Sequence, residues 1–356
     1  MMARAGRIGA VLACLVLFSA APSSAQPGAQ ALTRLITDGL EHPVAIVTAA
    51  APNEAIYVVD RDGTVPELRH GGLTGDKLLD LSGSVHRTQR HRLMAIALHP
   101  DFAATQLFYA YYNDVQGDAV VGQFRASAKD TPDADSLVAT IKFAQPVPTQ
   151  NGGWLAFGPD KQLYISTADG GERGPDLSAA SLLGKIIRIS PQEAGGYKAP
   201  LDNPRNAKPG LSREVWASGF TSPEHFAFGE SGKVFVLDSR GEPAGAKVSL
   251  VAAGGTPAGA PSYTAARGER LVGGAVCRGC GLPAAEGGYL LADGASGKVF
   301  SLHEDGGKLV RREVTELTKG KISAINLTDT GSILATTEKG ELFELPLASA
   351  AKNAPQ

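Results

Sequence analysis

The chain has 356 residues, of which 43% are hydrophobic and 20% charged, a composition typical of a globular protein rather than a disordered one. Its 43 glycines and 22 prolines indicate many turns. The formal net charge is −2, which does not favour a polyanionic partner such as nucleic acid.

The first 25 residues have the pattern of a secretory signal peptide. Arg4 and Arg7 precede an apolar run at 8–21, and small residues follow that run. The pattern predicts a cleaved signal at 1–25 and a periplasmic or secreted protein, and no later stretch is long and apolar enough to span a membrane. Cys14 leaves a lipoprotein anchor as an alternative, although apolar residues continue beyond it.

Six units of similar pattern follow. Each has an apolar run, a polar turn with Pro, Asp or Gly, and a β-branched or aromatic run, which is typical of two antiparallel strands. Such a sheet cannot bury both faces alone, so the sequence predicts an all-β, six-bladed β-propeller over 30–347 and a flexible tail at 348–356. The strand pairs are expected at 44–46 and 55–59, 96–101 and 107–111, 155–160 and 162–166, 226–228 and 233–237, within 271–302, and at 324–327 and 332–336.

Some details of this fold can also be predicted. One end of the chain is expected to lend a strand to the blade formed by the other end. Trp154 and Trp216 lie in strand-like contexts and are expected to pack between blades. Helical periodicity is weak, and the best short candidate is the segment 177–183.

Two cysteines follow the predicted signal, Cys277 and Cys280, with Arg and Gly between them. In an oxidising compartment they are expected to close a small local disulfide. A zinc site needs four ligands, and the sequence has neither a second cysteine pair nor a close histidine pair to complete one. Thiol–disulfide exchange is an alternative because the spacing suits it, but the strand and long helix of a thioredoxin-like site are absent.

Four stretches of the chain read as motifs rather than as a simple strand pattern: RLMAIALHPDF at 92–102, NGGWLAFGPD at 151–160, LLGKIIRI at 182–189 and EVWASGF at 214–220. They resemble motifs of the soluble PQQ-dependent sugar dehydrogenases, the glucose/sorbosone dehydrogenase-like superfamily. The resemblance extends over about 92–300. It implies a six-bladed propeller with PQQ over its central face, which accepts a hydride from an aldose while a histidine takes the hydroxyl proton.

The resemblance also implies where the catalytic groups belong. The histidine base should immediately precede the GGxLAFGPD run, but Gln150 stands there, and a carboxamide cannot accept the proton. Asp169 matches the aspartate that orients this histidine, or else caps a turn. His225 is a candidate for a displaced base, with a half-buried structural role as the alternative.

Residues expected to contact the cofactor are replaced as well. The arginine that polarises the quinone and a nearby glutamine correspond to Thr221 and Glu224, so a fixed cation is lost and a negative charge is added. Lys319 and Lys321 fall near an Arg-x-Arg pair that holds the carboxylates of PQQ, or else belong to a solvated loop.

The calcium-associated motif of these enzymes corresponds to 241–249, where the acidic run is replaced. Since calcium takes six to eight oxygen ligands with carboxylates among them, only the backbone carbonyls of Gly241 and Glu242 remain as candidate metal ligands. PQQ and calcium are therefore cofactors that the resemblance implies and these replacements weaken.

Three functions follow from this reasoning. The first is a PQQ-dependent sugar dehydrogenase with rearranged groups, whose activity is weak, redirected or lost. The second is a non-catalytic propeller that binds a carbohydrate-like small molecule. The third, a lactonase-type hydrolase, needs a carboxylate-rich metal cleft that the sequence does not assemble. Neither the ligand nor the oligomeric state can be predicted.

Overall fold

The structure is a computed structural model that describes residues 33–50, 54–86, 93–127, 131–145, 153–171, 180–204, 210–239, 245–317, 320–328 and 330–345. Within these ranges the chain forms strands β1 to β25, one helical turn, α1 (Phe102–Thr105), and one 3-10 turn (Ala134–Ser136). The described part of the candidate helix, 180–183, is not helical. The predicted segments 1–25 and 348–356 lie outside the described residues.

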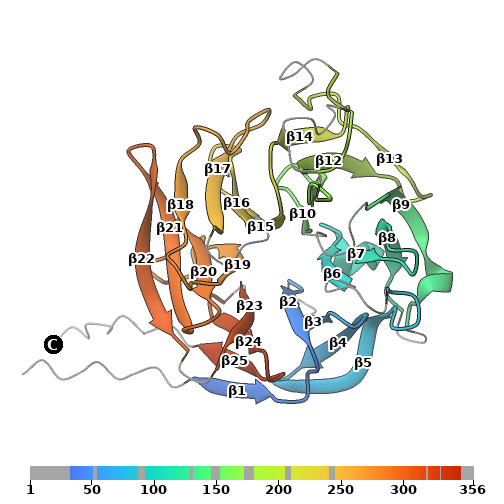
Figure 1. The fold of residues 1–356 in the computed structure, drawn as a ribbon. Helices are drawn as coiled ribbons and strands as arrows, with labels where there is room; N and C mark the ends of the chain where they lie inside the picture. The colour runs from blue at the N-terminus through green and yellow to red at the C-terminus, as the bar shows by residue number, and fades with distance from the viewer. Residues whose placement is uncertain are drawn as a thin grey trace, which may run out of the picture. The chain divides into compact units, whose positions relative to one another are not determined.

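The strands form six antiparallel sheets arranged in a ring, so the predicted six-bladed propeller is confirmed (Figure 1). Blade 1 contains β2 (Pro43–Thr48), β3 (Ile56–Asp60), β4 (Thr64–Arg69) and β5 (Gly72–Asp80). Blade 2 contains β6 (Leu93–Leu98), β7 (Leu107–Asn113), β8 (Ala119–Arg125) and β9 (Val138–Phe143). Blade 3 contains β10 (Leu155–Phe157), β11 (Leu163–Thr167), β12 (Lys185–Pro191), β13 (Tyr197–Lys198) and β14 (Val215–Ser218).

The remaining blades continue the same order. Blade 4 contains β15 (Pro223–Phe228), β16 (Val234–Asp238), β17 (Lys247–Val251) and β18 (Ser262–Thr264). Blade 5 contains β19 (Leu271–Val276), β20 (Tyr289–Asp293), β21 (Lys298–Asp305) and β22 (Lys308–Glu316). Blade 6 contains β23 (Ile322–Leu327), β24 (Ile333–Thr337), β25 (Leu342–Leu345) and β1 (Arg34–Thr37).

The inner strand of each blade faces the axis of the ring, and the second strand lies next to it. Figure 1 shows the inner strands β2, β6, β10, β15, β19 and β23 around the centre. Every residue of the second strands β7, β11, β16, β20 and β24 is buried. Neighbouring blades cover both faces of these strands, which explains their continuous runs of apolar residues.

Blade 6 takes strands from both ends of the described chain. β1 pairs antiparallel with β25, with Arg34 opposite Glu344, and the side chains of these two residues form a salt bridge of 2.5 Å. The expected closure of the ring by a strand from one end is therefore confirmed.

Aromatic side chains pack between blades as the sequence predicted. Trp216 is buried in an apolar cluster that joins blades 3 and 4 through Tyr164 and Phe226. The ring of Trp154 lies 4.0 Å from that of His225 on blade 4.

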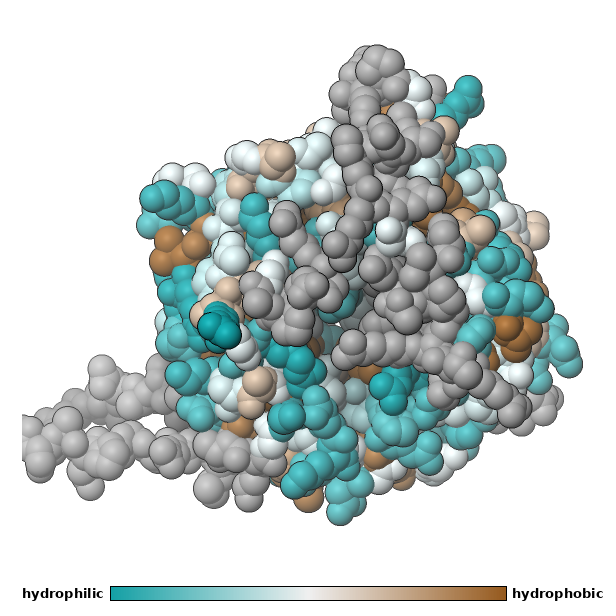
Figure 2. Space-filling view, viewed as in Figure 1, coloured by the Kyte–Doolittle hydropathy of each residue, from teal (hydrophilic) through white to brown (hydrophobic). Residues whose placement is uncertain are grey.

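On the face seen in Figure 2, polar and apolar side chains are intermixed among the coloured residues. Among the described residues, the exposed large apolar side chains are spread over five blades, at Leu35, Leu73, Val115, Val138, Leu201 and Val310. Single apolar residues on a surface need no partner. No helix within the described ranges is long and apolar enough to cross a membrane.

Candidate functional site at the strand-entry face

The six inner strands begin at the same end of the ring, which we call the strand-entry face. Antiparallel pairing places the start of each inner strand beside the end of the second strand, as in Pro223 opposite Asp238. Adjacent blades are joined there by backbone hydrogen bonds. Leu93 donates to the carbonyl of Arg61 at 3.1 Å, and Asp169 donates to the carbonyl of Thr221 at 2.8 Å. Residues far apart in sequence therefore meet at this face.

Three blades repeat one device at the strand-entry face: an aspartate at the end of the second strand accepts hydrogen bonds from backbone amides at the start of the inner strand. In blade 1, Asp60 accepts from the amide of His42 at 2.8 Å. In blade 4, Asp238 accepts from the amides of Thr221 and Ser222 at 3.0 and 2.8 Å. These carboxylates fix the backbone from which the side chains of this face project.

Asp293 is the equivalent residue of blade 5. It accepts from the amides of Arg270 and Ala295, both at 3.0 Å, and from the hydroxyl of Ser296 at 2.5 Å. Burial alone would raise the pKa of Asp293, but these hydrogen bonds outweigh burial and lower the pKa. The residue is therefore held as a carboxylate.

Asp169, Thr221 and Glu224 lie together where blades 3 and 4 meet. Asp169 is buried, and its carboxylate accepts a hydrogen bond of 2.9 Å from the amide of Gly171, the geometry of a turn cap. The carboxylate of Glu224 accepts a hydrogen bond of 2.7 Å from the hydroxyl of Ser239. The structure thus brings three of the sequence-predicted site residues to one edge of the strand-entry face.

His225 follows Glu224 on β15, where the pairing with β16 is irregular between Pro223 and His225. Its side chain is buried, and Nδ1 is hydrogen-bonded to the hydroxyl of Tyr289 at 2.8 Å. Its ring packs against Trp154, with centroids 4.0 Å apart, and against Tyr289, with centroids 5.9 Å apart. Burial lowers the pKa of His225 to about 3, so the imidazole is neutral.

The stack of His225 with Trp154 and Tyr289 was not foreseen from the sequence. One local signal was available in the glycine pair that begins at Gly273. A Cβ atom at Gly273 would overlap Cγ of His225 and the hydroxyl of Tyr289, so this position needs glycine for close approach.

Basic residues occur on the other side of the strand-entry face, on blades 5 and 6. Lys321 is exposed and directly precedes β23. Arg270 donates to the carbonyls of Gly294 and Ile322 at 3.0 and 2.8 Å and forms a salt bridge of 2.9 Å with Glu338. The remaining sequence-predicted site residues, Gln150, Lys319, Gly241 and Glu242, lie outside the described residues.

Within the described ranges, two groups of His, Cys, Asp or Glu lie close enough to hold a metal ion, and one of them is at the strand-entry face. This group consists of His42, Asp60 and Asp62. The two carboxylate oxygens of Asp60 accept backbone hydrogen bonds from His42 and Asp62, at 2.8 and 2.7 Å. Nδ1 of His42 is 2.7 Å from Asp62. These contacts serve the local turn and do not form the carboxylate-rich centre of a lactonase-type hydrolase.

Comparison with known proteins places this chain in a family. The sequence profile described as Glucose / Sorbosone dehydrogenase matches residues 40–267. The chain belongs to the glucose/sorbosone dehydrogenase family. Within curated proteins, it is 26% identical over 224 residues to the aldose sugar dehydrogenase YliI of Escherichia coli, covering 61% of this chain and 58% of that protein. It is 27% identical over 241 residues to an uncharacterized protein of Synechocystis, covering 62% of this chain and 56% of that protein.

The chain therefore spans somewhat more than half the length of these two relatives. A structural relative is the PQQ-bound form of the aldose sugar dehydrogenase from Streptomyces coelicolor, with a TM-score of 0.67 and 20% identity. The superposition covers 88% of this chain and 98% of that one. At this identity the likeness shows the fold alone.

The residues described at the strand-entry face fit PQQ poorly. Thr221 and Glu224 stand where the resemblance places groups that contact the quinone, and neither supplies a fixed cation for its reduction. The carboxylate of Glu224 would repel the carboxylates of PQQ. The resemblance expects Lys319 and Lys321 near the carboxylates of PQQ. Of these two lysines, only Lys321 is among the described residues.

Proposed function

We propose that this protein is a ligand-binding propeller of the glucose/sorbosone dehydrogenase family in which oxidation of aldose sugars is weak or lost. One observation carries the proposal. His225, the histidine nearest in sequence to the expected quinone contacts, is sealed in an aromatic stack with its pKa lowered to about 3. A general base needs a pKa near the working pH and access to the proton it removes, and His225 has neither.

The side chains of Asp169, Glu224 and Lys321 support ligand binding rather than redox chemistry. Carboxylates accept hydrogen bonds from hydroxyl groups, and a lysine donates them, so the strand-entry face suits a small, polyhydroxylated ligand of carbohydrate type. In the proposed role, a ligand binds where the substrate and cofactor of a dehydrogenase would lie, but no histidine accepts a proton there.

We further propose that the protein works outside the cytoplasm, as the pattern at 1–25 supports. N-terminal sequencing of the protein from a periplasmic fraction should find the chain beginning after residue 25. A mature chain that still begins at Met1 would contradict export by this signal.

The loss of oxidation can be tested with purified protein, PQQ and calcium. Binding of PQQ is followed by absorbance, and turnover by dye reduction with a panel of aldoses. The variants are Gln150→His alone and together with Thr221→Arg, and the matched control is Gln116→His on an exposed turn of blade 2. Removal of a general base typically costs about 10²–10⁴-fold, so the wild type and the control should stay near background.

Each outcome of this assay decides a separate point. Regained turnover in the double variant would support a binding site derived from a dehydrogenase. Turnover by the wild type at about 1 s⁻¹ or faster would lie in the ordinary range for enzymes and would overturn the proposal. Calorimetric titration with the same aldoses tests binding, and the absence of binding to any of them would refute a carbohydrate-type ligand.

A further inference from the structure

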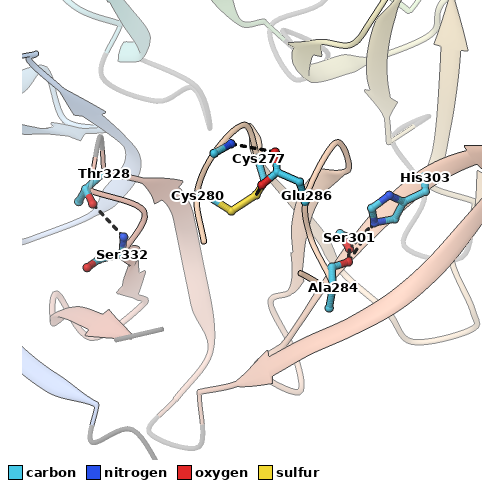
Figure 3. The surroundings of a disulfide bond; sticks show 9 residues. Cys277, Cys280, Ala284, Glu286, Ser301, His303, Thr328 and Ser332 are labelled. Atoms are coloured by element: carbon cyan, nitrogen blue, oxygen red, sulfur yellow. Dashed lines mark hydrogen bonds between the residues drawn. A yellow bond between two sulfur atoms is a disulfide. The ribbon is translucent and has the colours of Figure 1, made fainter. Parts of the chain in front are cut away.

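The second group of potential metal ligands lies on the hairpin between β19 and β20 in blade 5. Cys277 and Cys280 form a disulfide with a Cα–Cα distance of 5.5 Å, which confirms the local disulfide predicted from their spacing (Figure 3). Both cysteines are buried in an apolar cluster that includes Leu290 of blade 5 and Ile333 of blade 6.

A carboxylate lies directly beside this disulfide. Oε2 of Glu286 is 3.6 Å from Sγ of Cys277, and Oε1 accepts a hydrogen bond of 2.8 Å from the amide of Gly279 (Figure 3). One ligand atom from each of Cys277, Cys280 and Glu286 lies within 4.8 Å of the others. The cysteine pair alone offers two ligand atoms and the hairpin adds a third, so that one water would complete the four ligands that zinc takes.

The hairpin is held by contacts that do not depend on the sulfur–sulfur bond. Gly279 and Gly281 have φ angles of 63° and 73°, the left-handed conformation that permits the tight turn. The amide of Cys277 donates to the carbonyl of Gly288 at 3.0 Å. Arg278 donates to the carbonyls of Phe228 and Gly229 in blade 4, at 2.7 and 2.9 Å. The two cysteines should therefore stay close together when the disulfide opens.

We propose that the reduced hairpin is a zinc site formed by Sγ of Cys277, Sγ of Cys280 and a carboxylate oxygen of Glu286, with water as the fourth ligand. A dithiol reductant first converts the disulfide into two thiols and is itself oxidised to a disulfide. Zinc then forms two Zn–S bonds as the thiols release two protons, and Glu286 adds a Zn–O bond. No redox change of the metal is involved.

The ligand types and their spacing select zinc over the harder cations. Two cysteines separated by two residues form the chelating turn common in zinc sites, and thiolates favour zinc, whereas calcium and magnesium require oxygen ligands. Tetrahedral Zn–S bonds of about 2.3 Å would place the two sulfurs about 3.8 Å apart. Side-chain rotation can provide that separation with the Cα atoms 5.5 Å apart. Glu286 is exposed, so it gives the ion a path from solvent.

Cobalt(II) is the spectroscopic probe for this site, because thiolate ligation gives an intense near-ultraviolet charge-transfer band and tetrahedral geometry gives strong visible bands. Protein reduced with a phosphine is titrated with cobalt, and zinc is then added to displace it. The oxidised protein and the double variant Cys277→Ser/Cys280→Ser serve as negative controls. Glu286→Gln keeps both thiols, and Asp305→Asn, at the exposed end of β21 in the same blade, is the matched control.

The reduced wild type and Asp305→Asn should bind one cobalt ion per chain with thiolate bands, and zinc should abolish those bands. Loss of an outer-shell partner alone typically costs about 10–100-fold in metal affinity, so Glu286→Gln should weaken binding by at least about tenfold. Unchanged affinity in Glu286→Gln would remove this residue from the site. The absence of thiolate bands in reduced protein, or loss of its strand circular dichroism on reduction, would overturn the proposal.

Discussion

Burial of His225 predicts that the protein loses stability under mildly acidic conditions. Burial lowers the pKa of His225 to about 3 in the folded protein, whereas a histidine in an unfolded chain has a pKa of about 6.5. Between these values the unfolded chain binds a proton that the folded chain does not. The contribution of His225 to the free energy of unfolding is therefore complete above about pH 6.5 and decreases as the pH falls towards 3.

The size of this effect follows from the two pKa values. Between pH 7 and pH 5, protonation of His225 in the unfolded state alone lowers the free energy of unfolding by about 2 kcal/mol. His99 and His303 add to the effect in the same direction, because burial also lowers their pKa values. The contribution of His225 must therefore be isolated by comparing variants.

The comparison uses Tyr289→Phe and the double variant His225→Phe/Tyr289→Phe. Removing both partners avoids leaving the buried Tyr289 hydroxyl unsatisfied, which would cost about 1–3 kcal/mol. Urea unfolding at pH 7 and pH 5 gives the free energy of unfolding for each protein. On going from pH 7 to pH 5, the free energy of unfolding of the double variant should fall by about 2 kcal/mol less than that of Tyr289→Phe. Equal losses in the two variants would refute a neutral, buried His225.

Two further predictions concern the backbone of the strand-entry face and its packing. Asp293→Asn should lower the free energy of unfolding at pH 7 by about 1–3 kcal/mol, because the amide lacks the negative charge and has no second oxygen to accept from the hydroxyl of Ser296. Since folding lowers the pKa of Asp293, the stabilisation by its carboxylate is present above about pH 4 and is lost below it. In denaturant unfolding, the difference in free energy of unfolding between the variant and the wild type should therefore be smaller at pH 3 than at pH 7. Gly273→Ala should destabilise by about 1–3 kcal/mol through overlap with His225, whereas Gly72→Ala, where a Cβ atom meets nothing within 4 Å, should change stability by much less. Equal thermal shifts for the two alanine variants would contradict the packing described around His225.

Much of the propeller could be predicted from the sequence because its inner strands carry a strong signal. The inner and second strands are apolar, and the turns between them contain Pro, Asp or Gly, so five pairs were located and the pair of blade 5 was placed only within 271–302. The outer strands were not. β22 reads KLVRREVTE and is largely exposed, because one of its edges and much of its surface face solvent.

The candidate site was predictable only where motifs were continuous in sequence. The resemblance places Thr221 and Glu224 beside the expected quinone contacts, and the structure puts them at one edge of the strand-entry face with Asp169. The stack of Trp154, His225 and Tyr289 joins three blades, and its only trace in the sequence is the glycine pair at Gly273, which does not say which side chains approach it. Glu286 reaches Cys277 only because the hairpin folds back, which spacing alone does not reveal.

The pairing of β1 with β25 also constrains how this ring folds. Arg34 meets Glu344 across a sequence separation of 310 residues, so the sheet of blade 6 can be completed only after the intervening blades have brought those ends together. Contacts between such distant residues slow folding, and until they form both strands expose unpaired edges. If β1 pairs late, the ring remains incomplete while the other blades are already folded. In that state two copies of the chain could exchange β1, so the incomplete ring is the species most prone to dimerise.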